Sequence, residues 1–345
     1  MSFVTYQVLI KPKVIIHNLD STPRVSIVIV TWNSLKHILR CLDCLSKQTY
    51  KLYEVIVVDN DSRDGTVEYV KRNYPQIKVV QNEENVGFAK ANNQGIRLAQ
   101  GEFILLLNPD VFPEPSFIEE LMRVLSQRGS YGSAGGKLLL YENGKESSTI
   151  DSTGLFLKKN FRSSDRGNLK EDQGQYNQEE DVFAICGAAV LFRREALEKV
   201  SISEEYLDED FFAYYEDLDI GWRMQLIGYK CVYTPKAKAY HVRGGSGLGA
   251  KFFQKDLDTQ RLTLRNRYLM LIKNLSLSNL LFFSPYFFLT ELTVMFYICI
   301  RSPRLLRVYL DVTKNLAKSW KKRSFIQSSR IKDSRYIRYW IKRAP

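Results

Sequence analysis

The chain has 345 residues, which is room for about two domains, and its 45% hydrophobic and 26% charged residues are typical of a globular protein with a real core. Its five cysteines, an odd number in so long a chain, argue against a disulfide framework and fit a reducing cytoplasm. The net charge of +12 lies entirely in residues 301–345, which hold 14 Lys or Arg and 2 Asp or Glu. This distribution predicts a surface-binding appendage on a neutral domain.

The N-terminal segment, residues 1–22, is predicted to form a β extension in front of the main domain. Residues 4–10 and 14–17 have the pattern of short strands, with a turn at Pro12 between them. The segment has no charged leader followed by an apolar stretch, so we expect no signal peptide.

Residues 23–108 alternate between strand and helix patterns. Continuously apolar, β-branched runs predict buried strands, and the segments between them have helical periodicity. The predicted strands are residues 25–31, 53–60, 77–82 and 102–108, and the predicted helices are residues 34–46, 66–74 and 88–99. This order is typical of βαβ units with a largely parallel sheet. Cys41 and Cys44 fall in the first helix, where we expect them to face the interior rather than bind zinc or form a redox pair.

The carboxyl end of each predicted strand is polar or acidic. Ligands of open parallel sheets bind beyond these ends, so a candidate site lies there. The side chains concerned are Thr31 and Asn33, then Asp59, Asn60 and Asp61, then the stretch 82–87, and finally Asn108 and Asp110. The first strand is followed by TWNSLKH, which lacks the glycine pattern of a nicotinamide site, and the chain contains no P-loop motif.

Beyond residue 144 the simple alternation is predicted to end. Residues 145–180 are rich in Ser, Gly, Asn, Asp and Lys, which predicts loops or a mobile flap. Residues 182–197 then read as a strand and a helix, residues 211–228 as an acidic entry to another helix, and residues 230–249 as a strand that ends in a glycine-rich loop. With three histidines in the chain, a multi-histidine metal site is disfavoured.

Four stretches in this order resemble the inverting glycosyltransferases of family 2, which have the GT-A fold. They are VSIVIVTWNS; VVDNDSRDGT; NVGFAKANNQGI with LLLNPD; and YYEDLDIGWRMQLIGY with AYHVRGGS. The likeness is greatest to the rhamnosyltransferase-like bacterial branch, and it covers about residues 23–249. It implies an α/β domain with a Rossmann-like, mostly parallel sheet that binds a nucleotide-diphospho-sugar.

The resemblance places the nucleoside contacts of the donor at the ends of the first two strands. Side chains there can hydrogen-bond a pyrimidine edge or ribose hydroxyls, and the matching residues are Thr31, Asn33, Asp59, Asn60 and Asp61. NVGFAKANN is similar to the stretch that lies along the nucleotide, where Gly87 permits close backbone approach and Asn92 or Asn93 contacts the donor. The alternative is that Asp61, Ser62 and Asp64 only cap a turn and the next helix.

A divalent cation is implied at two further matches. Asp110 stands at the last aspartate of the family's D-x-D metal motif, whereas Asn108 replaces the first, so the motif keeps one acidic ligand. His241 matches a histidine that joins the metal site in several members. Such a site would hold Mg²⁺ or Mn²⁺ against the donor diphosphate, over which Arg243 and the glycines after it could close. The alternatives are that Asp110 is a cap, that His241 is structural and that the glycine-rich loop is an idle linker.

The catalytic base is implied in YYEDLDIGWR, which carries Glu216, Asp217 and Asp219 at the mouth of a helix. The family's catalytic aspartate matches Asp217, which would take the proton of the acceptor hydroxyl during in-line attack on the anomeric carbon. A single displacement with one base inverts the configuration. The alternative is that all three acids only favour the helix dipole. Trp222 is expected in the core rather than beneath a sugar.

The C-terminal third is predicted to contact a membrane. Residues 280–300 are almost long and apolar enough to span one, but Pro285 and Glu291 interrupt them and both flanks are basic. We therefore expect a re-entrant or in-plane segment, with a buried core helix as the alternative. Apolar residues then recur at helical spacing from Leu305 to Trp320 opposite basic ones, which predicts an amphipathic helix. Its expected partner is an anionic membrane surface and not nucleic acid, for which no motif occurs.

Three regions are thus predicted: an N-terminal β extension (1–22), a GT-A glycosyltransferase domain (23–250) and a helical, basic, membrane-associating region (251–345). The predicted function is inverting transfer of a sugar from dTDP-rhamnose or a UDP-sugar to a lipid-linked glycan acceptor, at the cytoplasmic face of the cell membrane. Tethering the domain there raises the effective concentration of the acceptor. The alternatives are a nucleotidyltransferase, which would need a basic, glycine-rich triphosphate loop after the first strand, and a catalytically weak membrane-bound partner that retains the fold.

Overall fold

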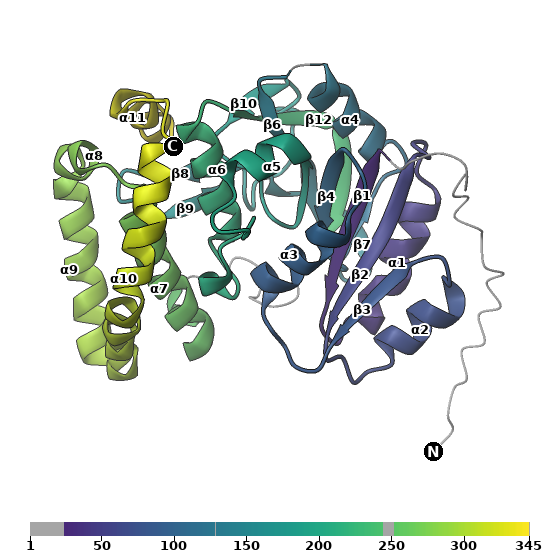
Figure 1. Cartoon of the computed structure of the whole chain (residues 1–345), viewed down its shortest axis with the longest axis horizontal. Helices are drawn as coiled ribbons and strands as arrows, with labels where there is room; N and C mark the ends of the chain where they lie inside the picture. Colours follow the sequence, from purple (N-terminus) through teal and green to yellow (C-terminus); the bar gives the residue numbers. More distant parts are fainter. Residues whose placement is uncertain (1–23, 128, 244–251, 345) are drawn as a thin grey trace.

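The computed structural model describes residues 24–127, 129–243 and 252–344. The predicted strands in residues 1–22 and the glycine-rich loop after Arg243 lie outside these residues. A sheet flanked by helices forms one side of the molecule, and the C-terminal helices form the other, with α9 (Ser284–Arg301) at the outer edge (Figure 1).

The first part of the chain follows the predicted alternation. Its strands are β1 (Val25–Thr31), β2 (Tyr53–Asn60), β3 (Lys78–Asn82) and β4 (Phe103–Leu107), and its helices are α1 (Leu35–Ser46), α2 (Thr66–Asn73) and α3 (Phe88–Leu98). The pairs β1–β2, β1–β4 and β2–β3 are all parallel. The predicted elements are confirmed to within one residue at each end, because strands covered on both faces are apolar throughout and easy to distinguish from amphipathic helices.

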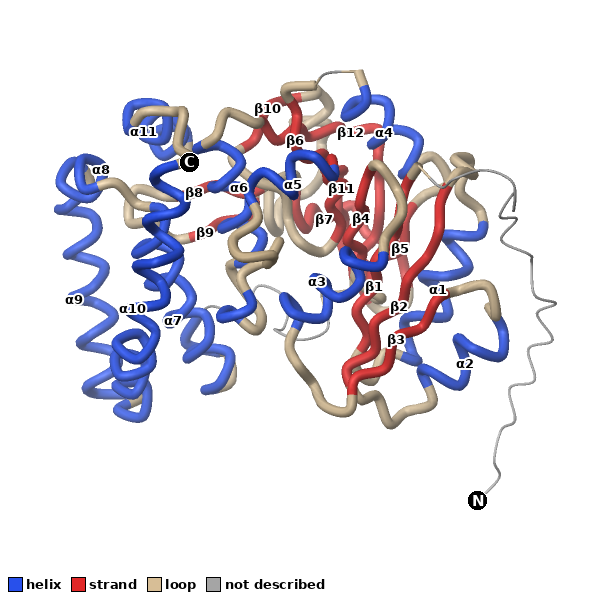
Figure 2. Tube along the Cα trace, viewed as in Figure 1, coloured by secondary structure: helices blue, strands red, loops and turns tan. Residues whose placement is uncertain are grey.

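The complete sheet is mixed and runs in the order β10-β12-β6-β11-β4-β1-β2-β3, with β5 beside β12 and β7 beside β6 (Figure 2). The added strands are β5 (Val111–Pro113), β6 (Tyr131–Glu142), β7 (Lys145–Ser152), β10 (Glu180–Val182), β11 (Ala189–Arg193) and β12 (Lys230–His241). β11 is antiparallel to both β4 and β6, and β12 is parallel to β6. These two reversals make β12 run in the direction of β4, so their carboxyl ends share one edge of the sheet.

The prediction of loops or a flap over residues 145–180 was wrong in part. This segment contains β7, which pairs with β6, and the hairpin β8 (Leu155–Leu157) and β9 (Ser163–Asp165). β7 is polar and lies beside only one strand of the sheet path, and just its last three residues are buried. Its sequence therefore lacks the apolar signal by which buried strands are found.

The remaining helices cover the sheet and build the C-terminal region. They are α4 (Phe117–Ser126), α5 (Arg194–Val200), α6 (Glu216–Leu226), α7 (Leu257–Asn274), α8 (Leu277–Phe282), α10 (Arg307–Ser328) and α11 (Ser334–Arg343), with short 3₁₀ turns η1 (Glu209–Phe211), η2 (Phe252–Gln254) and η3 (Pro303–Leu306). Trp222 is fully buried against Phe183, with ring centroids 5.9 Å apart, as expected of a core residue. Cys41 is buried and Cys44 half-buried, and both are free thiols that face the interior from α1, as predicted.

The C-terminal region is not the simple appendage that its charge predicts. Lys322 of α10 is buried, and its Nζ lies 2.8 Å from Oε2 of Glu205 and 2.5 Å from Oδ1 of Asp208. Lys273 of α7 also pairs with Asp208. Part of the excess positive charge therefore ties α10 to the segment before α6, and Lys273 ties α7 to the same segment. No helix in the described part of the chain has both the length and the apolar character needed to cross a membrane.

Candidate functional site

A cavity of about 470 Å³ opens at the edge of the sheet where β4 and β12 end. Asn108 and Asp110 follow β4 and line one wall, together with His241 and Arg243 at the end of β12. Asp217 at the start of α6 lines the same cavity. Residues far apart in the chain thus meet here because β4 and β12 share a direction and α6 begins at the same edge.

Asp110 and His241 are brought together by the short strand β5. Pairing of β5 with β12 places Val111 opposite His241, so the preceding Asp110 reaches the imidazole. Oδ1 of Asp110 lies 3.5 Å from Nε2 of His241. A main-chain hydrogen bond also joins the two segments, since the amide of Val242 donates to the carbonyl oxygen of Asp110 at 3.1 Å.

A second carboxylate, Asp151 on β7, fixes the other side of this imidazole. Nδ1 of His241 lies 2.8 Å from Oδ2 of Asp151, which is fully buried. Burial alone would lower the pKa of His241, but its hydrogen bonds to Asp110 and Asp151 outweigh burial and raise that pKa to about 9. Carboxylates that bind one ring nitrogen in this way orient the other nitrogen of metal-binding histidines.

Asp151 also anchors Arg243. Nε of Arg243 donates to Oδ1 of Asp151, and Nη2 donates to Oδ2 of Asp165 on β9 at 3.1 Å. Burial raises the pKa of Asp165, and the Arg243 cation opposes that shift. Both acids hold the guanidinium in the cavity wall, where a cation suits a phosphate group.

Asp217 lies in the first turn of α6 with both carboxylate oxygens placed by main-chain donors. Oδ2 accepts from the amide of Gly187 at 3.0 Å, and Oδ1 accepts from the amide of Leu218 at 2.7 Å. Burial raises the pKa of Asp217 to about 6, although these hydrogen bonds oppose the shift. Burial and the charge of Asp217 raise the pKa of the adjacent Glu216 to about 8. Near neutral pH, Asp217 is therefore the member of this pair that gives up its proton first.

The loop before α6 is held in a strained conformation. Phe212, Tyr214 and Tyr215 have φ angles of 63°, 75° and 74°, in the left-handed region that non-glycine residues rarely adopt. Asn266 of α7 is fully buried, and its Nδ2 lies 2.8–2.9 Å from the carbonyl oxygens of Phe211, Ala213 and Tyr214. A polar side chain from the C-terminal region thus sets the entry to the helix that carries Asp217.

The residues predicted to bind the nucleoside lie outside this cavity, at the ends of β1 and β2. Thr31 donates to Oδ2 of the buried Asp59 at 2.7 Å. Asn60 donates to the carbonyl oxygen of Gly87 at 3.3 Å. Oδ1 of Asn33 accepts from the amide of Arg63, whose side chain pairs with Asp61 at 3.1 Å. These side chains form one polar cluster at the sheet edge, and their contact with a donor stays a prediction.

Two other predicted contacts have structural partners. Asn92 is buried in α3 and donates to the carbonyl oxygen of Phe88 at 2.9 Å. Gly87 has a φ of 89°, and a Cβ atom there would lie 2.5 Å from the ring of Phe212. The close approach that requires glycine is therefore to the loop before α6. Asn93 likewise binds the main chain of Leu207.

Sequence reasoning missed Asp151, Asp165 and Asn266. The first two lie in the polar segment that was predicted to form loops, and Asn266 lies in α7, which carries no motif. Trp32 was also passed over, although it stands between Thr31 and Asn33 and is 59% exposed. An exposed aromatic ring at a strand end is the one signal among these that the sequence could have supplied.

The predicted metal site has two candidate protein ligands in this cavity, Asp110 and His241. Among the described residues, no group of three or more His, Cys, Asp and Glu side chains is arranged to hold a metal ion. A cation at this wall would therefore need oxygen atoms from a bound substrate to complete its coordination.

The chain resembles known proteins in its sequence. Residues 26–201 match the sequence pattern of glycosyl transferase family 2. An N-acetylglucosaminyl-diphospho-decaprenol L-rhamnosyltransferase of Mycobacterium tuberculosis is 26% identical over 243 residues, which cover 64% of this chain and 76% of the relative. The glycosyltransferase AglE of Haloferax volcanii is 32% identical over 130 residues, 36% of this chain and 43% of the relative.

Two solved structures have the same fold. GalNAc-T7 with UDP, GalNAc and Mn²⁺ superposes with a TM-score of 0.57 and 17% identity, covering 74% of this chain and 48% of the other. A mannosyltransferase from Pyrobaculum calidifontis in complex with GDP-Man and Mn²⁺ superposes with a TM-score of 0.52 and 18% identity, covering 94% and 84%. At these identities the likeness shows the fold alone, which is the predicted GT-A fold with a mixed, mostly parallel sheet and a C-terminal helical region.

Proposed function

We propose a specific reaction for this chain, which belongs to glycosyltransferase family 2 and transfers a sugar from a nucleotide-sugar donor. In the proposal, Asp217 is the general base of a single inverting displacement, and Asp110 with His241 binds a divalent cation at the donor diphosphate. The observation that carries it is that Asp110, His241 and Asp217 line one cavity at the carboxyl edge of the sheet.

The donor side of the cavity fits a diphosphate. Asp110 and, on loss of its Nε2 proton, His241 would supply one oxygen and one nitrogen donor, a set that suits Mn²⁺ together with oxygens from the substrate. When bound, Mg²⁺ or Mn²⁺ neutralises negative charge on the leaving diphosphate. Arg243, held by Asp151 and Asp165, adds a fixed cation on the same wall. The nucleoside would lie along Thr31, Asn33, Asp59, Asn60 and Asp61, as the family resemblance implies.

The acceptor side carries the proton transfer. An acceptor hydroxyl oxygen attacks the anomeric carbon, the bond from that carbon to the diphosphate oxygen breaks, and the hydroxyl proton passes to Asp217. Two main-chain donors keep the carboxylate of Asp217 aimed, and burial keeps its pKa near the pH at which a base works best. The products are the inverted glycoside, the nucleoside diphosphate and protonated Asp217.

The sugar is proposed to be rhamnose from dTDP-rhamnose, with UDP-sugars next, and the acceptor a lipid-linked glycan of envelope polysaccharide synthesis. The mycobacterial relative, whose name specifies an L-rhamnosyl group and a decaprenol diphosphate, supports this choice. We place the protein at the cytoplasmic face of the membrane; the C-terminal helices support contact with a membrane, because α9 exposes Phe288, Leu289, Leu292 and Phe296.

The product of the reaction tests the proposal. Thermal-shift measurements over a panel of nucleotide sugars, with and without Mn²⁺, first identify the donor by the largest stabilisation. NMR of the glycoside formed from that donor is then expected to show an anomeric configuration opposite to that of the donor. Retention of configuration would overturn the single-displacement mechanism. Stabilisation by a nucleotide sugar without any sugar transfer would favour the alternative, a catalytically weak binding partner that retains the fold.

A further inference from the structure

A second cavity, of about 840 Å³, lies among the C-terminal helices and outside the site described above. It is a groove with α7 as one wall, α9 and α10 as the others, and α8 at one end. Its volume falls within the range of small-molecule sites. The motifs of the family do not reach this groove, and the sugar-transfer chemistry does not use it.

The apolar stripe of α10 lines this groove. Tyr309, Val312, Leu316 and Trp320 follow one another at helical spacing and all face it. Leu316 and Trp320 remain 45% and 60% exposed, so the stripe that would normally enter a core has no full cover among the described residues. Facing it, α9 contributes Phe287 and Met295.

The interior of the groove carries no unpaired acid among the described residues. Its single carboxylate, Glu291, accepts hydrogen bonds from Nη1 of Arg267 at 2.6 Å and from the hydroxyl of Tyr268. A neutralised carboxylate in an otherwise apolar wall is compatible with a hydrocarbon occupant, which has no hydrogen bonds to offer.

The α8 end of the groove is cationic. Arg323 lies there with Nη1 donating to the carbonyl oxygens of Ile272 and Leu275 at 2.7 and 2.8 Å. Its guanidinium stacks 5.5 Å from the ring of Trp320. No carboxylate among the described residues forms an ion pair with Arg323. An apolar channel that ends in an unpaired guanidinium matches a molecule with a hydrocarbon tail and a phosphate head.

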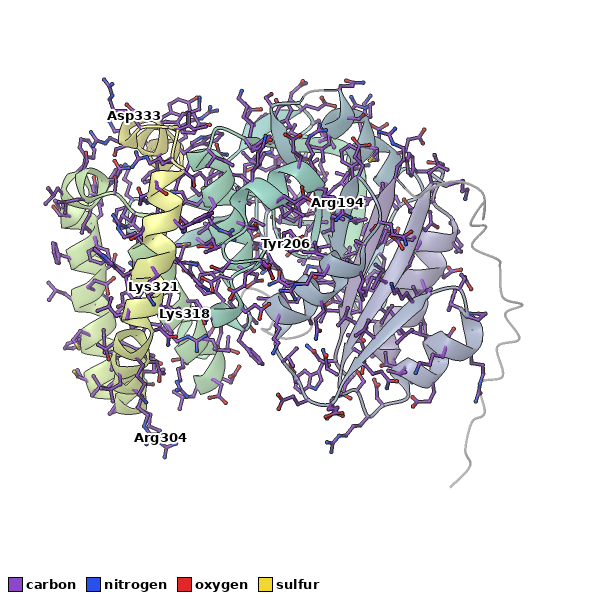
Figure 3. All side chains as sticks on the ribbon, in the orientation of Figure 1. Arg194, Tyr206, Arg304, Lys318, Lys321 and Asp333 are labelled. Atoms are coloured by element: carbon purple, nitrogen blue, oxygen red, sulfur yellow. The ribbon has the colours of Figure 1, made fainter. Side chains whose placement is uncertain are left out.

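The outer surface supplies a route of entry. Phe288, Leu289, Leu292 and Phe296 form an exposed apolar face of α9 beside the residues that line the groove. Lys321 stands along α10 and Arg304 lies at the far end of the helical region (Figure 3), whereas Lys318 is paired with Asp210. Apolar side chains with basic neighbours suit the interface of an anionic bilayer, from which a lipid tail could pass sideways into the groove.

We propose that this groove binds the hydrocarbon tail of the lipid-linked acceptor, with Arg323 at its phosphate. The claim that the occupant is the acceptor rests on the proposed function. The claim that the groove binds a phosphorylated isoprenoid does not depend on that function. A docked protein helix is less suited, since it would be about 10 Å wide and would leave Arg323 without an anion. The groove would hold the acceptor on the enzyme.

Calorimetric titration of the full chain tests this with no donor and no metal present. The probes are geranyl phosphate, farnesyl phosphate, farnesol and inorganic phosphate, all below micelle-forming concentrations. Each buried methylene strengthens binding about threefold to fourfold, so farnesyl phosphate is expected to bind at least about tenfold more tightly than geranyl phosphate. Arg323→Gln is expected to remove the preference for farnesyl phosphate over farnesol. Equal affinities for the two chain lengths would overturn the proposal.

Two matched variants locate the site. Thr313 lines the groove and Thr293 is exposed on α9 outside it, and each donates its hydroxyl to a main-chain oxygen of its own helix. Thr313→Trp should weaken farnesyl phosphate binding at least about tenfold by filling the groove, and Thr293→Trp should leave it within twofold. Equal effects of the two would contradict the assignment. If Thr313→Trp weakened binding to phosphatidylglycerol vesicles as much as to farnesyl phosphate, the groove would serve the bilayer and not the acceptor. Failure of this titration leaves sugar transfer unaffected, so the two proposals fail separately.

Discussion

Asp151 and His241 form a buried pair in which Oδ2 of the carboxylate lies 2.8 Å from Nδ1 of the imidazole. The two residues lie 90 positions apart in the chain and meet because β7 and β12 both flank β6. The pair leaves Nε2 of His241 facing Asp110. A residue outside every family motif thus sets the direction of the nitrogen that is proposed to bind the cation.

Asp151→Asn is expected to weaken Mn²⁺ binding about 10- to 100-fold, since it removes the charge that orients and polarises the imidazole. Calorimetric titration of Mn²⁺ in the presence of the nucleoside diphosphate measures the effect. Asp165→Asn is the matched control, because Asp165 shares Arg243 with Asp151 but does not touch His241. Equal losses in both variants would show that Arg243, and not His241, carries the effect.

The rate of sugar transfer is expected to fall with acidification below about pH 6. Asp217 acts only as the carboxylate, and burial raises its pKa to about 6, so kcat/KM should drop about tenfold for each pH unit below that value. The measurement is a pH–rate profile at saturating Mn²⁺. The charge of Asp165 contributes to the raised pKa of Asp217, so Asp165→Asn should move the acidic limb to lower pH. If the acidic limb of the pH–rate profile stayed in place in Asp165→Asn, the assignment of that limb to Asp217 would be wrong.

Asn266→Ala is expected to lower kcat by at least about tenfold and to change donor affinity little. Loss of the amide removes this donor from the carbonyl oxygens of Ala213 and Tyr214 and leaves that of Phe211 with Arg265 as its donor, so the start of α6 and Asp217 can shift. Asn315→Ala on α10 is the control, because Asn315 donates to the carbonyl oxygen of Asp311 within its own helix. Steady-state kinetics with donor titration separates kcat from binding, and an unchanged kcat would show that the loop holds its shape alone.

Lys322→Met is expected to reduce the free energy of unfolding by about 3–5 kcal/mol, because it leaves the buried Asp208 with one fewer cation. Burial alone would raise the pKa of Asp208, but Lys273 and Lys322 outweigh burial and lower that pKa. The stabilisation is therefore present above the pKa of an unfolded aspartate and is lost as pH falls through the folded value. Denaturant unfolding of Lys322→Met beside Lys321→Met, its exposed neighbour, checks this. Equal stability of the two variants at pH 7 would refute it.

Much of the fold could be predicted from the sequence, because β1 to β4 are buried on both faces and carry continuous apolar runs. The strand β7 could not, since its polar residues pair at the edge of the sheet and only a partner strand reveals them. The role of Lys322 was hidden for a similar reason. A lysine in a basic helix reads as solvent-exposed until the acids that surround it are placed in space.

The convergence of Asp110 and Asp217 on one cavity could be predicted, because both follow family motifs at strand or helix ends. Asp151 and Asn266 could not, because they act through His241 and through main-chain oxygens rather than on a substrate. Their contributions depend on strand order and on the packing of α7, which the spacing of residues along the chain does not encode.

The central claim is that Asp110 and Asp217 face one bound donor with different tasks. Parallel measurement of donor affinity and single-turnover rate in Asp110→Asn and Asp217→Asn tests it most directly. We expect Asp217→Asn to bind donor and Mn²⁺ as the natural chain does and to lose about 10²- to 10⁴-fold in rate. Asp110→Asn should instead lose Mn²⁺-dependent donor affinity. Substantial turnover by Asp217→Asn, or full Mn²⁺-dependent affinity in Asp110→Asn, would contradict the account.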